Sequence, residues 1–239
     1  MSIIIGTTTA PYKALSGEDL DWLHGAEDMI AQTLPVIEGD LIYAAALEVD
    51  GRGAGVYDAL YKRLGQLEAF SPRVKVMVWT FSVDDNDKEI NGANRLVRIC
   101  TGRNMIHEMV NRMPEVSHVM FIDSDLKIPA DSLVKLLEMD HPIVGGDVPS
   151  YCLGGPWVPE YDLPVQQHWN TAGFLLITSA VARKLRWRSD LQAGSTDDPC
   201  FASDAEAMGF GPTYVRKDII GIHRPLAAVE HRGHDLRIY

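Results

Sequence analysis

The sequence predicts an α/β fold whose central sheet is mostly parallel and carries helices on both faces. Short runs of β-branched and aromatic residues alternate along the chain with segments in which apolar residues recur at helical spacing. Strands that alternate with helices pair in parallel, because each helix carries the chain back to the start of the next strand. The 239 residues contain no repeat, low-complexity segment or linker, so we expect a single domain over residues 1–239.

The expected strands are apolar, largely β-branched runs that end at a glycine, a polar residue or a turn. They cover residues 2–7, 41–49, 74–81, 117–122, 141–146, 168–177 and 214–222. The expected helices have apolar residues three or four positions apart, and Ser16 and Pro129 stand where helix starts are favoured. They cover residues 18–34, 56–67, 96–113, 132–138, 179–185 and 199–208. Glycine, proline and acidic residues predict loops at 50–55, 82–94, 151–167 and 189–197.

Composition argues against several classes of protein. With 46% apolar and 23% charged residues the chain is typical of a globular protein, and its net charge of −11 disfavours general nucleic-acid binding. Cys100, Cys152 and Cys200 are odd in number and form no CxxC pair, so we expect free thiols rather than a zinc ribbon or a disulfide framework. No apolar run approaches the ~20 residues of a membrane span, and the N-terminus lacks a basic leader, which predicts a cytoplasmic protein.

Two carboxylates follow the strand expected at 117–122, in the segment Asp123-Ser124-Asp125. Ligands of open α/β sheets bind beyond the carboxyl ends of the strands, and residues two apart in an extended chain point the same way. Carboxylate oxygens suit Mg²⁺ or Mn²⁺, and these ions usually share their shell with substrate phosphates. The segment therefore predicts a divalent-cation and diphosphate site, although an aspartate after a strand also commonly forms an Asx-turn or a helix cap.

The strand and DSD segment at 118–125 resemble the strand and DxD motif of GT-A glycosyltransferases, most closely the small family-2-like enzymes of bacteria and phages. Later segments agree in order, namely IVGG at 143–146, WNTAGFLLI at 169–177, DDPCF at 197–201 and IIGIH at 219–223. The resemblance is good from residue 103 to residue 223. It implies a Rossmann-like GT-A domain with a nucleotide-binding part at about 1–125 and an acceptor and sugar part at about 126–239.

The resemblance also implies the cation and base residues. Asp123 and Asp125 would bind the cation and His223 would complete its shell, with a plain polar strand end as the alternative for His223. Asp198, with Asp197 as the second candidate, would take the proton of the acceptor hydroxyl if the enzyme inverts configuration. The alternative for Asp198 is a helix N-cap, because it precedes a proline, which is favoured at the first helical position.

Residues for the donor sugar and the nucleotide form a further group. Trp169, Asn170, Thr171 and Gly173 would shape the sugar pocket, and Ser124 with Asp123 would contact the nucleotide, although a tryptophan is also ordinary core. The first nucleotide-binding strand is either 3–8 or 41–49. In the former case Thr7 and Thr8 lie where the base would sit. Arg103 and Asn104, on the helix before the DSD strand, would contact phosphate or base, with an ion pair or a solvated helix face as the alternative for Arg103.

Together these features predict transfer of a sugar from a nucleotide-sugar donor of UDP or GDP type to a hydroxyl-bearing acceptor, with Mn²⁺ or Mg²⁺ as cofactor. Nucleotidyl transfer is one alternative, but it would want a basic glycine-rich loop after the first strand, and no basic residue precedes Lys13. A non-catalytic nucleotide-sugar-binding module is the other. The sequence leaves open the sugar, the acceptor (glycan, lipid, protein or modified nucleobase), inversion against retention, the oligomeric state and the role of residues 50–55.

Overall fold

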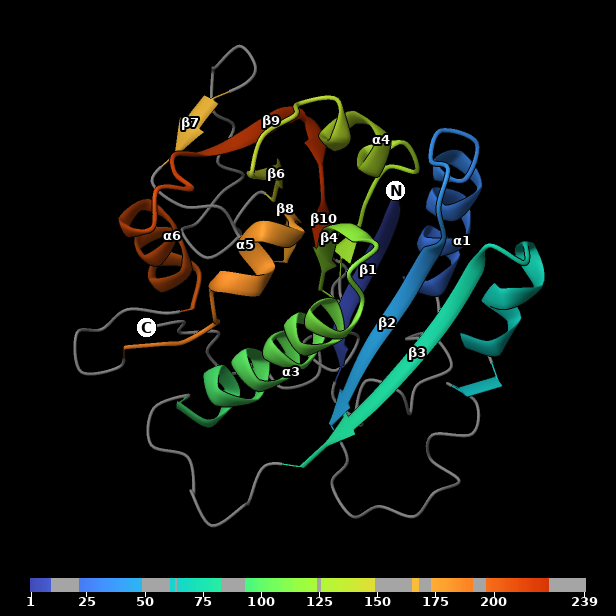
Figure 1. The fold of residues 1–239 in the computed structure, drawn as a ribbon, viewed down its shortest axis with the longest axis horizontal. Coiled ribbons are helices and arrows are strands. Elements are labelled where there is room, and N and C mark those ends of the chain that lie inside the picture. Colours follow the sequence, from blue (N-terminus) through green and yellow to red (C-terminus); the bar gives the residue numbers. More distant parts are fainter. Residues whose placement is uncertain are drawn as a thin grey trace, which may run out of the picture.

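The structure, a computed structural model, describes residues 1–9, 22–48, 61–62, 64–82, 93–123, 126–148, 165–167, 173–190 and 197–223. Its centre is an eight-stranded sheet in the order β3-β2-β1-β4-β8-β6-β9-β7 (Figure 1). These strands are β1 Ser2–Thr9, β2 Leu41–Glu48, β3 Val74–Phe81, β4 Val116–Ile122, β6 Ile143–Asp147, β7 Val165–Gln167, β8 Phe174–Thr178 and β9 Thr213–Ile220. A second, two-stranded sheet pairs β5 (Leu126–Lys127) with β10 (Ile222–His223).

Most strands of the large sheet run in one direction, as the sequence predicts. Strands β3, β2, β1 and β4 pair in parallel, and so do β6 and β9. Strand β8 is antiparallel to both β4 and β6, and β7 is antiparallel to β9. The carboxyl ends of β1, β2, β3, β4 and β6 therefore lie along the same edge of the sheet, where ligands of α/β folds bind.

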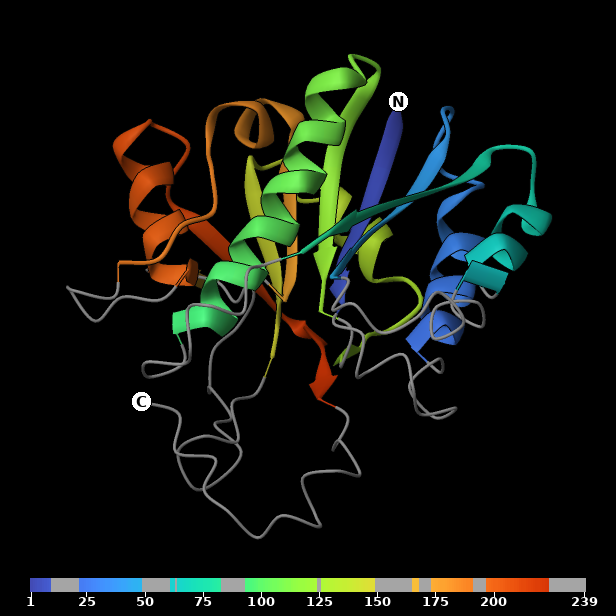
Figure 2. The ribbon, with the colours of Figure 1, turned by 90° about the horizontal axis from the view of Figure 1, so that it is seen from below.

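Helices cover both faces of the sheet (Figures 1 and 2). They are α1 Trp22–Thr33, α3 Ala93–Arg112, α4 Ser132–Leu137, α5 Ser179–Lys184 and α6 Asp197–Ala207, with a short 3₁₀ helix η3 at Glu68–Phe70. Ile3 and Ile5 of β1 pack into the core under α1 and α4, whereas Ile4 packs into the core under α3, α5 and α6. A strand that is buried on both faces is apolar at every position, which explains the unbroken isoleucine run.

The expected elements that fall on described residues are present, with ends shifted by a few residues, apart from two short strands and one helix start. Of the helix expected at 56–67, only residues 61–62 and 64–67 are described, and these are helical. Residues Leu126–Lys127 form β5, which was not expected. Residues 165–167 were expected in a loop and instead form β7, an edge strand that pairs with β9. Helix α6 begins at Asp197 rather than at Pro199. Cys100 and Cys200 are free and buried, as expected, whereas Cys152 lies outside the described residues.

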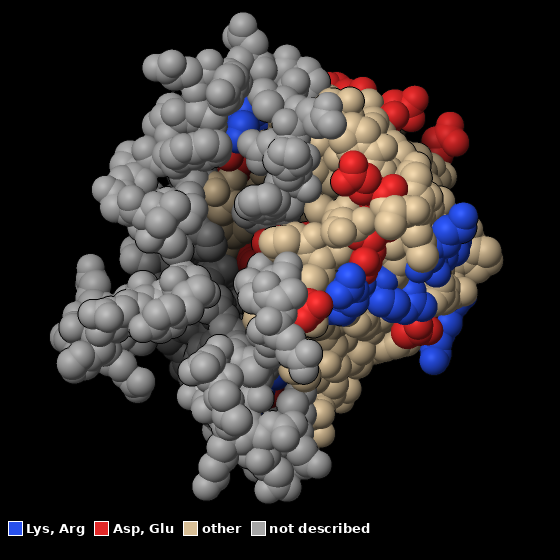
Figure 3. All heavy atoms as spheres, turned by 90° about the vertical axis from the view of Figure 1, so that its left-hand side faces the viewer, with Lys and Arg blue, Asp and Glu red and all other residues tan. Residues whose placement is uncertain are grey.

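Several charged side chains on the described surface form ion pairs. Figure 3 views the side of the molecule that carries α6, where described basic side chains lie beside acidic ones. Arg186 pairs with Glu108 at 2.9 Å, and Arg188 pairs with Asp204 at 2.7 Å. Among the helices of the described chain, none combines the length and the apolar character that a membrane crossing requires.

A buried histidine belongs to the core beneath α3. His107 is fully buried, and its Nδ1 lies 3.0 Å from the carbonyl oxygen of Leu185. A carbonyl oxygen only accepts, so Nδ1 carries the proton and Nε2 is free to accept from the indole N–H of Trp187 at 3.1 Å. Burial lowers the pKa of His107 from 6.5 to about 4. The neutral ring is therefore the form that the folded protein holds near neutral pH.

This burial predicts a pH dependence of stability. Between pH 6.5 and about 4 the unfolded chain binds a proton at His107 that the folded chain does not, so the free energy of unfolding falls as the pH falls through this window. Relative to His107→Gln, which does not titrate, the wild-type protein should lose about 3 kcal/mol across it. Urea unfolding at a series of pH values measures the difference. Parallel pH profiles for the two proteins would contradict it.

Candidate functional site

The carboxyl edge of the sheet carries the DSD segment. Asp123 follows β4 directly, and β4 is the neighbour of β1. The backbone N–H of Asp123 donates to the carbonyl oxygen of Gly173 at 2.9 Å, and the carbonyl oxygen of Asp123 accepts from the N–H of Leu126 at 3.0 Å. These two bonds tie Asp123 to the start of β8 on one side and to β5 on the other. Ser124 and Asp125 lie outside the described residues.

A buried arginine joins Asp123 to the acidic start of α6. Arg103 of α3 is only 3% exposed, and its Nη2 donates to Oδ1 of Asp123 at 3.0 Å. Its Nη1 donates to Oδ2 of Asp197 and lies 3.7 Å from Oδ1 of Asp198. Burial alone would lower the pKa of Arg103, but the charges of Asp123, Asp197 and Asp198 outweigh it and raise that pKa. The guanidinium therefore stays charged and holds the carboxylates of both segments together.

The ion-pair alternative for Arg103 is thus the one that the structure shows. Its Nη1 and Nη2 groups are directed at carboxylates, so we do not count it among the phosphate ligands. Asn104, expected to contact the phosphate or the base, is bound to the backbone of Trp187 instead. Its side-chain amide donates to the carbonyl oxygen of Trp187 at 2.9 Å and accepts from the N–H of Trp187 at 2.8 Å. Both polar atoms of Asn104 hold the chain after α5, and a nucleotide contact of this residue stays a prediction.

The two candidate bases differ in their surroundings. The side chain of Asp197 is 9% exposed and is bound to Arg103, whereas that of Asp198 is 27% exposed. Because α6 begins at Asp197, Asp198 lies within the first turn of the helix rather than at an N-cap before Pro199. Of the two, Asp198 has the carboxylate that is more accessible from solvent.

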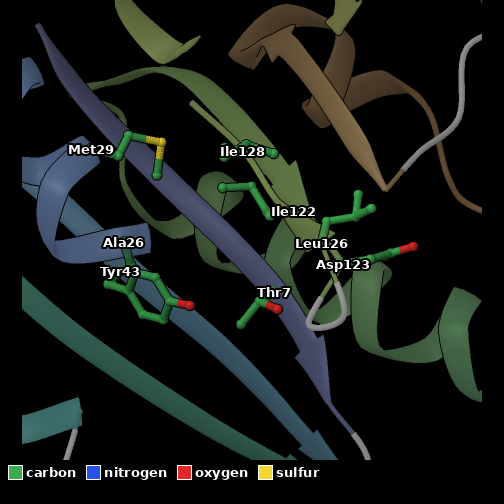
Figure 4. Close-up of a pocket in the computed structure, with 8 residues that line it drawn as sticks. All are labelled: Thr7, Ala26, Met29, Tyr43, Ile122, Asp123, Leu126 and Ile128. Carbon is green, nitrogen blue, oxygen red and sulfur yellow. The ribbon is translucent and has the colours of Figure 1, made fainter. Parts of the chain in front are cut away.

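Thr7 and Thr8, at the carboxyl end of β1, lie on opposite sides of the sheet. The Oγ1 of Thr7 is buried and has no hydrogen-bond partner among the described residues. Thr7 and Asp123 line one pocket (Figure 4), together with Ala26, Met29, Tyr43, Ile122, Leu126 and Ile128. Thr8 instead faces α3, where a Cβ on Gly102 would lie 2.6 Å from its Cγ2. Leaving a buried hydroxyl unpaired costs about 1–3 kcal/mol, so a small polar group beside Thr7 would stabilise this pocket.

Gly173 leaves room for the second oxygen of Asp123. A Cβ on Gly173 would lie 2.5 Å from Oδ2 of Asp123, which is closer than any real contact allows. The carboxylate of Asp123 therefore has Oδ1 bound to Arg103 and Oδ2 directed over the glycine, with 36% of the side chain exposed. Glycine is required at this position by the close approach of the carboxylate.

The strand pair β5–β10 brings His223 near the DSD segment along the backbone. His223 is paired with Leu126, the residue that follows Asp125. The side chain of His223 is outside the described part of the structure, as are Trp169, Asn170 and Thr171. Within the described part, no three His, Cys, Asp or Glu side chains gather as a metal-binding group. The metal and sugar roles of these residues remain predictions.

Trp187 is a site neighbour that the sequence did not single out. The guanidinium carbon of Arg103 lies 4.9 Å from the centre of its ring. The tryptophan stands between two arginines, in the segment RWR at 186–188, which gave no signal of a buried position. The only sequence feature that could have indicated a buried Trp187 is that it is an apolar residue between charged ones after a short helix.

Comparison with known proteins identifies the fold. No protein-family model and no curated protein sequence matches the chain. The structure matches that of GalNAc-T7 with UDP, GalNAc and Mn²⁺, with a TM-score of 0.56 and 9% identity over 93% of this chain and 44% of that one. It also matches A197 from STIV (TM-score 0.49, 11% identity, 95% and 87% covered) and the galactosyltransferase LgtC in complex with donor and acceptor sugar analogues (0.47, 13%, 89% and 73%).

The likeness to GalNAc-T7 shows the fold, and it does so independently of the motifs. The chain has the GT-A fold, a single α/β domain with a mostly parallel sheet and helices on both faces. It spans less than half the length of the GalNAc-T7 chain, 44% of it. The fold confirms the structural part of the resemblance seen in the sequence.

The contact between Gly173 and Asp123 predicts the effect of a single methyl group. Gly173→Ala forces the carboxylate of Asp123 away from its position and strains its bond to Arg103, so the free energy of unfolding should fall by about 1–3 kcal/mol. Gly65→Ala is the matched control, because a Cβ there meets nothing within 4 Å and the residue is helical. It should change stability by less than ~1 kcal/mol, and upwards. Equal urea midpoints for Gly173→Ala and the wild type would refute the close contact.

Proposed function

We propose that the chain is a metal-dependent glycosyltransferase, which moves a sugar from a nucleotide-sugar donor to a hydroxyl acceptor. The observation that carries the proposal is the bridge from Arg103 to Asp123 and Asp197. It gathers, at the ligand-binding edge of the sheet, the carboxylate expected at the donor and the acidic helix start expected at the acceptor. The fold supports the proposal, since GalNAc-T7, which shares it, has a structure with UDP, GalNAc and Mn²⁺.

The described part of the DSD segment supplies one carboxylate that suits a hard divalent cation. Oδ1 of Asp123 is bound to Arg103 and 36% of the side chain is exposed, so Oδ2 is the oxygen that we propose for the cation. We propose that Asp123, Asp125 and His223 hold Mn²⁺ or Mg²⁺. A bound cation of this kind offsets the negative charge that develops on a departing diphosphate.

The nucleotide and sugar would lie on either side of this segment. The unpaired hydroxyl of Thr7, in the pocket that Asp123 also lines, is our candidate contact for a polar group of the nucleotide. Ser124 would join it from the DSD segment. Trp169, Asn170 and Thr171, which precede Gly173 in the chain, are our candidates for the donor sugar.

For a reaction with inversion, the chain supplies the base. Asp198 takes the proton of the acceptor hydroxyl, and the acceptor oxygen forms a bond to the anomeric carbon of the sugar. The bond from that carbon to the diphosphate oxygen breaks, and its electron pair leaves with the nucleoside diphosphate. Asp197 is the weaker candidate, because Arg103 occupies it and it is nearly buried.

A nucleotide screen tests the donor half of the proposal. We expect one of UDP, GDP, CDP and TDP to raise the melting temperature in the presence of Mn²⁺, because a ligand that binds only the folded state stabilises it by about 2.7 kcal/mol at a hundredfold excess over Kd. Asp125→Ala should abolish the shift. Asp204→Asn should keep it, since Asp204 pairs with Arg188 away from the DSD segment. Thermal unfolding followed by fluorescence gives all of these values.

The outcomes of this screen separate the alternatives. A shift without Mn²⁺, retained in Asp125→Ala, would remove the cation from the proposal and leave a nucleotide-binding module. The absence of a shift with every nucleotide would reject the donor site altogether.

Replacement of the candidate base tests the acceptor half. Asp198→Asn should lower kcat for release of the nucleoside diphosphate by about 10²–10⁴-fold and leave the Kd of the donor unchanged. Asp197→Asn should instead lower the free energy of unfolding, because it leaves the buried charge of Arg103 less compensated. A folded Asp197→Asn variant without turnover, beside an active Asp198→Asn variant, would transfer the role of base to Asp197.

A further inference from the structure

The buried guanidinium of Arg103 has an aromatic platform on its other side. Its central carbon lies 4.9 Å from the centre of the Trp187 ring, and Trp187 is only 2% exposed. The ring face attracts a cation, so the ring stabilises the guanidinium at this position. Because the same guanidinium bonds to Asp123 and Asp197, the position of this ring affects the spacing between the two carboxylates.

Trp187 itself is fixed from three directions. Its backbone N–H and carbonyl oxygen are both bonded to the amide of Asn104, at 2.8 and 2.9 Å. Its indole N–H donates to Nε2 of His107 at 3.1 Å. Its ring stacks on Phe201 of α6, with the centres 3.9 Å apart and the planes 10° from parallel. Together these contacts leave the ring of Trp187 little freedom to turn or shift beside Arg103.

We propose that Trp187, oriented by His107, is a positioning residue that holds Arg103 and thereby sets Asp123 and Asp197 for donor and acceptor. The expected effect on turnover rests on the proposed function. The structural part, that Trp187 holds Arg103 in place, does not. It assigns a role to His107 on α3 and to Trp187 in the segment after α5. Neither residue would contact the donor or the acceptor. The bond between His107 and the indole is the element that can be removed selectively.

Two substitutions of similar volume isolate that bond. His107→Gln keeps a side-chain oxygen that accepts from the indole N–H, whereas His107→Leu has no acceptor and leaves the indole N–H unpaired. The indole signal of Trp187 in a ¹⁵N-correlated NMR spectrum is identified by its loss in Trp187→Phe. The Nη–H signals of Arg103 are identified in the same way with Arg103→Lys. We expect both sets of signals to move in His107→Leu and to stay close to their wild-type positions in His107→Gln.

A measurement of turnover completes the test. It is made under conditions in which every variant is folded. His107→Leu should lower kcat for nucleoside diphosphate release about tenfold, which corresponds to about 1.4 kcal/mol, and His107→Gln should stay within about threefold of the wild type. Leu67→Ala, a buried residue in the opposite core layer, controls for lost stability and should leave both kcat and the NMR signals unchanged.

The readouts separate this inference from the proposed function. Arg103 signals that stay in place in His107→Leu would overturn the positioning role, whatever the turnover. A kcat that falls equally in His107→Leu, His107→Gln and Leu67→Ala would also overturn it, because it would show a general effect of stability. If the wild type neither binds nor turns over any donor, the proposed function fails, and the NMR signals of Arg103 still decide whether Trp187 holds it.

Discussion

The site depends on one buried cation. Moving a guanidinium out of water costs several kcal/mol, and this cost is recovered only when carboxylates with good geometry surround it. Arg103 has Asp123 at 3.0 Å on one side and Asp197 on the other, while its buried Nε has no hydrogen-bond partner among the described residues. Asp123 follows β4 and Asp197 begins α6. Because the buried charge of Arg103 needs both carboxylates, it holds these two distant segments together at one edge of the sheet. Removing either carboxylate would leave an underpaired charge in the core.

The neighbours of this cluster are small where the chain must come close. Gly173 stands against the carboxylate of Asp123, and Gly102, one residue before Arg103, stands against Thr8 of β1. A side chain at either position would push α3 or β8 away from the central strands and lengthen the bonds of Arg103. On the far side of the guanidinium, the large flat ring of Trp187 fills the space instead. Glycine therefore occurs at two points of close approach around the site, and tryptophan lies against the guanidinium.

The sheet was predictable from the sequence because its signals are local. The isoleucine run of β1 and the apolar spacing of α3 specify elements that are buried on both faces or on one. Strand β7 was missed because it is three residues long and lies in a segment rich in proline and glycine. An ion pair was one of the alternatives for Arg103, but its partner could not be named, because Asp197 lies 94 residues further along the chain. Nothing in the local pattern of a helix distinguishes an arginine that binds phosphate from one that binds a distant carboxylate.

Two adjacent aspartates at the start of α6 allow two separate roles. Successive residues of a helix point about 100° apart, so the two carboxylates meet Arg103 differently: Asp197 is hydrogen-bonded to it, whereas Asp198 is only within ion-pair distance. The helix N-terminus favours negative charge on both. Asp197 compensates Arg103 through its Oδ2 and is nearly buried. Asp198 lies at 3.7 Å from the same guanidinium and is three times more exposed, 27% against 9%, which is why we propose Asp198 rather than Asp197 as the base.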